Sequence, residues 1–129
     1  PPVLLIEDNE QNRYLATFLL ERHGHAVVSA ADGPRGLELA LALAPCLVLL
    51  DIQLPGMDGY AVARSLRAHP SLRSTPIIAV TSYAMVGDRE KCLAAGCTGY
   101  IEKLINPATF IAEIEAYLPR AASSALPPT

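Results

Sequence analysis

Short apolar segments alternate with longer amphipathic ones along the 129-residue chain, and this alternation limits the fold more than any other feature. Five short segments predict β-strands, and several are apolar throughout, as is typical of parallel strands covered on both faces. Helical periodicity follows each of them. Five such units predict an α/β fold, a five-stranded parallel sheet in the order 2-1-3-4-5, doubly wound (flavodoxin-like), with five helices. The expected strands are Val3–Ile6, Ala26–Ala30, Leu47–Leu50, Ile77–Val80 and Tyr100–Ile101, and the expected helices are Glu10–Arg22, Pro34–Leu43, Gly59–Ala68, Asp88–Ala95 and Pro107–Leu118.

Turn and capping residues fall between these segments where the fold requires them. Asp32, Asp58 and Asn106 precede predicted helices and are suited to accept hydrogen bonds from the first free N–H groups. Pro107 suits a first helical position, and Gly96 suits a helix end.

Composition and charge exclude several classes of protein. Apolar residues make up 51% of the chain and charged residues 18%, which excludes a disordered chain. A net charge of −3 gives no general attraction to nucleic acid or to an anionic membrane surface, and the apolar runs are too short to span a bilayer. Three cysteines without a C-x-x-C pair favour a reduced, cytoplasmic setting. We expect one domain over residues 1–119, with residues 120–129 as a disordered tail or truncated linker.

Polar residues follow the predicted strands at the edge where parallel-sheet proteins bind ligands. Glu7 and Asp8 follow the first strand, Asp51 the third, Thr81 the fourth and Lys103 the fifth. The strand order brings the three acids together, where each pair of carboxylates ~4 Å apart repels by roughly 4 kcal/mol at an effective dielectric near 20. Proton uptake or a hard cation relieves this repulsion, and a site built only of oxygen ligands favours Mg²⁺.

An aspartate, a magnesium ion, a lysine and a hydroxyl are the groups that phosphoryl transfer to a carboxylate requires. Asp51 would attack phosphorus as the nucleophile. The cation and Lys103 would neutralise charge on the equatorial oxygens, and Thr81 would donate a hydrogen bond to one of them.

Four motifs carry a resemblance to a known family: VLLIEDN, LVLLDIQLPGMDG, AVTSYA and GYIEK. Over residues 2–119 the sequence resembles the receiver domain of two-component response regulators, especially single-domain regulators and receivers attached to hybrid histidine kinases. The resemblance implies that Asp51 accepts a phosphoryl group from the phosphohistidine of a histidine kinase or histidine phosphotransfer protein. The implied Mg²⁺ ligands are Asp8, Asp51 and the backbone carbonyl of Gln53, with Glu7 acting largely through water.

The resemblance also implies how the signal is passed on. Thr81 and Tyr100 correspond to the family's switch pair, and the fourth helix, fifth strand and fifth helix to its output face. Gln53 and Tyr83 border the approach of the hydrolytic water; we expect the ring of Tyr83 to obstruct that water and Gln53 to have the smaller effect. The family normally places proline, through a cis bond, after the lysine, where this chain has Leu104.

The first predicted helix carries a separate signal. Asn12, Leu15, Ala16, Leu19 and Leu20 form its core-facing stripe, which leaves Tyr14 and Phe18 one turn apart on another face. These rings either flank the core or form an exposed patch for a partner. In the family, phosphodonors dock on this helix, so the candidate docking residues are Asn9, Tyr14, Leu15 and Phe18.

Three functions fit these patterns. A phosphorylatable switch that catalyses only its own phosphorylation and dephosphorylation fits best. A protein-interaction module that works without phosphorylation is the alternative suggested by Leu104. A Mg²⁺-dependent phosphohydrolase of small molecules fits less well, because the sequence offers no substrate pocket beyond the strand edge.

Overall fold

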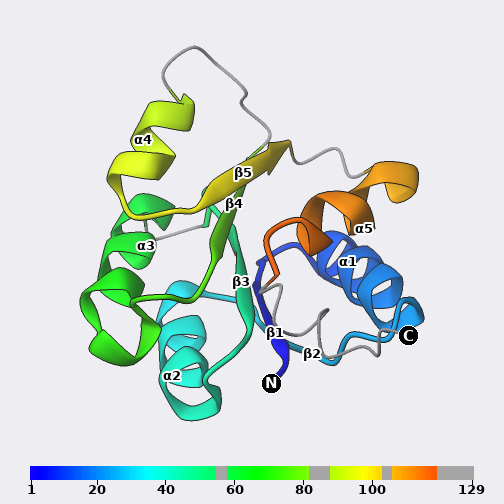
Figure 1. Cartoon of the computed structure of the whole chain (residues 1–129), viewed down its shortest axis with the longest axis horizontal. Helices are drawn as coiled ribbons and strands as arrows, with labels where there is room; N and C mark the ends of the chain where they lie inside the picture. Colours follow the sequence, from blue (N-terminus) through cyan, green and yellow to red (C-terminus); the bar gives the residue numbers. More distant parts are fainter. Residues whose placement is uncertain (55–57, 82–87, 103–105, 119–129) are drawn as a thin grey trace, which may run out of the picture.

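The computed structural model describes residues 1–54, 58–81, 88–102 and 106–118, and its five strands form one parallel sheet (Figure 1). The strand order is β2-β1-β3-β4-β5, which confirms the predicted doubly wound topology. β1 and β3, the two strands that end on the candidate acids, are direct neighbours, with Ile6 opposite Leu50. The strands are β1 (Val3–Ile6), β2 (Val27–Ala30), β3 (Leu47–Asp51), β4 (Ile77–Thr81) and β5 (Gly99–Glu102).

Helices cover both faces of this sheet. One face carries α2, α3 and α4 and the other carries α1 and α5, so the sheet is the middle of three layers (Figure 1). A 3₁₀-helix, η1, follows α3 and leads toward β4. The helices are α1 (Glu10–Arg22), α2 (Gly33–Leu43), α3 (Gly59–Ala68), η1 (Pro70–Leu72), α4 (Asp88–Ala94) and α5 (Pro107–Glu115).

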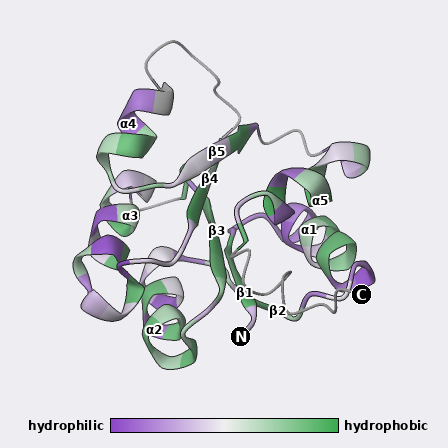
Figure 2. Ribbon diagram, in the orientation of Figure 1, coloured by the Kyte–Doolittle hydropathy of each residue, from purple (hydrophilic) through white to green (hydrophobic). Residues whose placement is uncertain are grey.

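The core consists of two layers of apolar side chains, one on each face of the sheet. Successive residues of a strand point to opposite faces, so Leu4 and Ile6 pack under α2 and α3 while Val3 and Leu5 pack under α1 and α5. All residues of β1, β3 and β4 are buried, and these strands are correspondingly apolar in Figure 2. Burying one large aliphatic side chain contributes about 1.5–3 kcal/mol, so the central strands are the main source of stability.

The structure corrects several predicted boundaries. β3 and β4 each continue one residue further, to Asp51 and Thr81, because the ladder extends that far: Asp51 pairs with Val80, and Thr81 with Glu102. β5 is likewise longer at both ends than predicted. β2 begins at Val27 rather than Ala26, α2 at Gly33 rather than Pro34, α4 ends at Ala94 rather than Ala95, and α5 ends at Glu115 rather than Leu118.

Helix ends follow the predicted chemistry. The side chain of Asp32 accepts from the Arg35 N–H, that of Asp58 from the Tyr60 N–H, and that of Asn106 from the Ala108 N–H. Gly96, just beyond α4, has φ +102°, a conformation that favours glycine. Over the described part of the chain, no helix has both the length and the apolar character needed to cross a bilayer.

Candidate functional site

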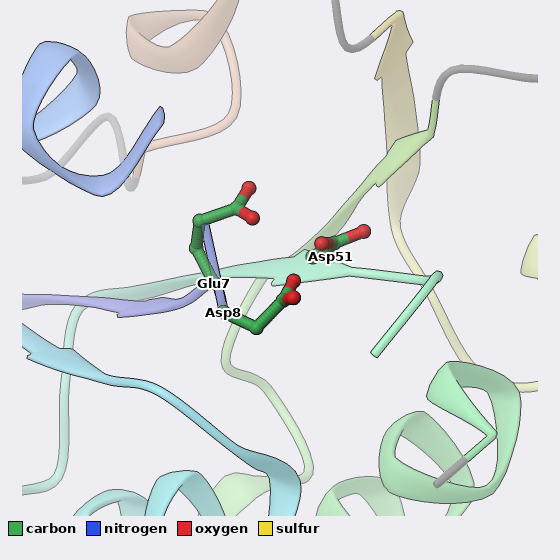
Figure 3. A group of neighbouring side chains, drawn as sticks. All are labelled: Glu7, Asp8 and Asp51. Carbon is green, nitrogen blue, oxygen red and sulfur yellow. The ribbon is translucent and has the colours of Figure 1, made fainter. Parts of the chain in front are cut away.

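Three carboxylates meet where β1 and β3 end. Glu7, Asp8 and Asp51 each offer an oxygen, and these oxygens lie within 4.8 Å of one another (Figure 3). Glu7 is 4% exposed and Asp51 1%, whereas Asp8 is half-buried. The strand order therefore brings together the three acids as predicted.

The turn that carries Glu7 and Asp8 is fixed by hydrogen bonds from three directions. The Glu7 N–H donates to the Ala30 carbonyl of β2 at 3.0 Å, which extends the sheet past the end of β1. The Asn9 N–H donates to Glu7 Oε2 at 3.1 Å. Nη1 of Arg13 donates to the carbonyls of Glu7 at 2.9 Å and Asp8 at 3.3 Å.

Arg13 was not predicted from the sequence as a site residue. Its side chain reaches back over the first turn of α1, the direction that helical side chains take. It holds the two carbonyls of the acidic turn and brings one positive charge to that turn. A basic residue one turn into the helix after an acidic pair was the available signal, but sequence spacing alone does not show that it reaches these carbonyls.

The orientation of Asp51 is set by the chain that follows it. The Gln53 N–H donates to Asp51 Oδ1 at 2.8 Å, and the Ile52 N–H donates to the Val80 carbonyl at 3.0 Å. The backbone at Gly59 then packs directly against the backbone of Ile52. The Gly59 N–H donates to the Ile52 carbonyl, and a Cβ on Gly59 would lie 2.4 Å from Ile52 Cα. Only glycine permits this close approach at the start of α3.

The three acids suit a hard divalent cation. They offer oxygen ligands alone, which Mg²⁺ prefers over the nitrogen and sulfur donors that favour zinc or copper. Oxygens around a bound Mg²⁺ lie roughly 3–4 Å apart, since each is about 2.1 Å from the ion. The present arrangement needs only a small inward movement to reach such distances.

Thr81 and Tyr100 lie on neighbouring strands and on the same face of the sheet. Tyr100 is paired with Ala79 across β4 and β5, and Thr81 follows Ala79 by two residues. Thr81 is 3% exposed, while Tyr100 is half-buried against the core beneath α3 and α4. Lys103, Leu104 and Tyr83 lie outside the described residues.

The aromatic pair of α1 is exposed. Tyr14 is 71% and Phe18 46% exposed, and their rings stack at 6.3 Å between centroids with an interplanar angle of 15°. The guanidinium of Arg22 lies 5.8 Å from the Phe18 centroid, an arrangement that permits a cation–π contact. Of the two interpretations left open by the sequence, the structure therefore supports an exposed patch.

The other two candidate docking residues have structural roles. The side chain of Asn9 accepts from the Asn12 N–H at 2.9 Å and caps α1. Leu15 is half-buried and packs against the core beneath α1 and α5. Any contact of Asn9 or Leu15 with a partner would therefore come in addition to these structural roles.

Comparison with known proteins identifies the family. The model of the response regulator receiver domain matches residues 3–115. The chain belongs to this family. It is 41% identical over 116 residues to the polar-differentiation response regulator DivK of Brucella anthropi, an alignment that covers 90% of this chain and 94% of that protein.

Solved receiver structures have the same fold. The receiver domain of a sensor histidine kinase from Pseudomonas aeruginosa PAO1, which holds a magnesium ion in its active-site cleft, is 35% identical with a TM-score of 0.82 over 90% of this chain and 95% of that one. The Vibrio cholerae chemotaxis protein CheY4 is 26% identical with a TM-score of 0.87 over 91% of this chain and 98% of that one. The recognised family and the predicted flavodoxin-like fold are thereby confirmed.

Proposed function

We propose that this receiver domain is a phosphorylatable signalling switch in a cytoplasmic two-component phosphorelay, and that Asp51 is its phosphoacceptor. The observation that carries the proposal is the buried Asp51 carboxylate at the end of β3, with Glu7 and Asp8 gathered beside it. Three acids placed together at a strand edge repel one another, and a bound cation would relieve that repulsion and offset the charge of an incoming phosphoryl group.

In the proposed reaction Asp51 attacks the phosphorus of a phosphohistidine. A P–O bond forms to the carboxylate, the P–N bond of the donor breaks, and its electron pair stays on the imidazole nitrogen. The Gln53 N–H holds Oδ1 of Asp51 and so fixes the plane of the attacking carboxylate. Bound Mg²⁺, held by Asp8, Asp51 and the Gln53 carbonyl with Glu7 acting through water, would offset the charge of the phosphoryl oxygens.

Thr81 and Lys103 complete the proposed site. The Thr81 hydroxyl would donate to a phosphoryl oxygen, and Lys103 would add a positive charge. Movement of Thr81 toward the phosphoryl group would leave room for Tyr100, which packs on the same face of the sheet. The shift would be read out on the face formed by α4, β5 and α5.

The phosphodonor would be a histidine kinase or histidine phosphotransfer protein that docks beside α1. This helix begins directly after the acidic turn, at Glu10, and it presents the stacked rings of Tyr14 and Phe18 to solvent. Exposed aromatic pairs of this kind are common anchors at protein interfaces. Loss of the phosphoryl group would depend on Gln53 and Tyr83, with Tyr83 obstructing the water.

Mass spectrometry after incubation with acetyl phosphate and Mg²⁺ tests the proposal. We expect a single addition of one phosphoryl group on the wild-type chain and none on Asp51→Asn. Absence of labelling on the wild type would favour an interaction module that works without phosphorylation. Release of phosphate from small esters in large excess over protein would favour a phosphohydrolase instead.

A further inference from the structure

A cavity of about 240 Å³ opens between α3 and α4, and it shares no residue with the acidic cluster. Small side chains on the α4 side leave this space open, whereas the α3 side is lined by a ring and a guanidinium. Its lining consists of Asp58, Tyr60 and Arg64 at the α3 side and Lys91, Ala94 and Ala95 at the α4 side.

Both walls of this α3–α4 pocket are held in place before any ligand arrives. Arg67, near the end of α3, donates from Nε and Nη2 to the carbonyl of Gly96, at 3.0 Å and 2.8 Å. Because Gly96 lies just beyond α4, these bonds tie the two helices together. Cys92 of α4 and Ala95, directly after it, are also buried in the same apolar layer as Val62 of α3.

The pocket carries a net positive charge on a chain whose overall charge is −3. Arg64 and Lys91 are exposed, and neither forms an ion pair with another residue in the described ranges. The carboxylate of Asp58 is engaged with its own helix, since it accepts from the Tyr60 N–H at 2.9 Å. Two cations against one carboxylate leave one positive charge, which matches a single carboxylate better than a phosphate dianion or a nucleic acid.

We propose that the α3–α4 pocket receives an acidic side chain of a protein partner. Arg64 and Lys91 donate to its carboxylate from opposite walls, and the Tyr60 ring packs against its methylene groups. The free volume suits one extended side chain. The site is thus a small, charged anchor point for an acidic segment.

The position of the pocket links this anchor to signalling. α3 begins eight residues after Asp51, and in the described part of the chain α4 is the next helix after Thr81. A carboxylate bound to both helices favours one relative arrangement of them. This link to phosphorylation rests on the proposed function of Asp51, whereas binding of the carboxylate does not.

Titration of the ¹⁵N-labelled full chain with two peptides tests the binding. The probes are acetyl-Ala-Ala-Glu-Ala-Ala-amide and the same peptide with glutamine in place of glutamate. We expect the glutamate peptide to give saturable amide shifts centred on Tyr60, Arg64, Lys91 and Ala94, and the glutamine peptide to give none. Equal responses to the two peptides, or a response to inorganic phosphate but not to the glutamate peptide, would overturn the proposal.

Variants locate the site. The double substitution Arg64→Gln with Lys91→Gln should weaken binding of the glutamate peptide at least about tenfold. The control double substitution Arg22→Gln with Arg73→Gln removes two exposed guanidiniums outside the pocket, so it changes the net charge by the same amount, and it should change the affinity less than about twofold. Equal losses in the two variants would mean that the peptide responds only to overall charge, and the proposal would fail.

The Asp51→Asn chain separates this inference from the proposed function. We expect it to bind the glutamate peptide as the wild type does, although it accepts no phosphoryl group. If the wild-type chain binds the peptide but is not labelled by acetyl phosphate, the proposed carboxylate pocket is supported and the proposed phosphorylation of Asp51 is rejected. Loss of peptide binding in a folded Asp51→Asn chain would reject the assignment of the peptide to the pocket.

Discussion

Ala44, directly after α2, occupies the left-handed region of backbone space with φ 47° and ψ 64°. A side chain with a Cβ is strained there, and glycine is not. Ala44 is exposed, so replacing it removes little packing. We expect Ala44→Gly to raise the free energy of unfolding by about 0.5–1 kcal/mol, measured by urea denaturation.

A nearby alanine provides the matched control. Ala42 is also exposed but lies inside α2, where glycine is a poor helix former. Ala42→Gly should therefore lower the free energy of unfolding by up to about 1 kcal/mol. Destabilisation by both substitutions would show that the strain at Ala44 is absent in solution.

Cys97 gives a prediction about pH. Burial, followed by the neighbouring Cys92, raises the pKa of its thiol from 9.0 to about 12. A pKa that is higher in the folded than in the unfolded chain gives a stabilising contribution below pH 9 that is lost as pH rises toward 12. We expect the stability of the wild type to fall between about pH 8 and pH 10.5 more steeply than that of Cys97→Ala, measured by urea denaturation at each pH.

Comparing how steeply stability falls with pH in the wild type and in Cys97→Ala isolates the contribution of the Cys97 thiol. Tyrosines and lysines titrate in the same pH range, but both chains contain them, so their contributions cancel in the difference between the two slopes. A constant difference in stability, caused by the smaller side chain alone, leaves the slopes equal. Parallel slopes would therefore show that the Cys97 thiol ionises at the same pH in the folded and unfolded chains.

At the scale of elements, Arg67 connects more of the structure than its place on a surface helix suggests. Besides Gly96, its Nη1 donates to the carbonyls of Leu72, Arg73 and Thr75, at 2.9, 2.8 and 2.8 Å. One guanidinium thus joins α3, η1, the approach to β4 and the turn after α4. Desolvation lowers the pKa of Arg67, which is the cost of placing the charge among these carbonyls.

Replacement of Arg67 should cost more than loss of a surface charge. We expect Arg67→Ala to lower the free energy of unfolding by about 3 kcal/mol, because several carbonyls lose a charged donor. Arg67→Lys should recover only part of this, since an ammonium lacks the planar fork that reaches two sites at once. Arg64→Ala, on the same helix, should change stability by less than about 0.5 kcal/mol in the same denaturation assay; similar effects of the two alanine substitutions would contradict the connecting role.

Elements differ in how far the sequence predicts them. β1, β3 and β4 were predictable because each contains four consecutive apolar residues, and the caps at Asp32, Asp58 and Asn106 because their side chains act locally. The proximity of Glu7, Asp8 and Asp51 followed from strand order alone. The roles of Arg13 and Arg67 could not be predicted in this way. A long side chain can reach many backbone carbonyls, and only the tertiary structure determines which of them lie within hydrogen-bonding distance.

At the scale of the whole molecule, we expect the acidic cluster to oppose folding unless a cation occupies it. Glu7, Asp8 and Asp51 are dispersed in the unfolded chain and gathered within 4.8 Å in the folded one. Asp8 is half-buried, so its neutral isostere fits without a large change in packing. In the absence of divalent cations, Asp8→Asn should therefore melt at the same temperature as the wild type or higher.

Addition of Mg²⁺ should reverse that order. A ligand that binds only the folded chain stabilises it by about 1.4 kcal/mol at ten times its dissociation constant, a gain of roughly 5–6 °C for a domain of this size. We expect the melting temperature of the wild type to rise through the millimolar range of Mg²⁺ and that of Asp8→Asn to stay nearly constant, so that the two curves cross. Calorimetry at fixed ionic strength measures both.

A charge-matched variant distinguishes site binding from general screening. Glu90 is an exposed acid on α4, and Glu90→Gln changes the net charge by the same amount as Asp8→Asn. Glu90→Gln should keep the full response to Mg²⁺, because the three acids of the cluster are intact. If the responses of Glu90→Gln and Asp8→Asn fall together, Mg²⁺ acts by screening the acidic chain as a whole, and the cluster at the ends of β1 and β3 is not its binding site.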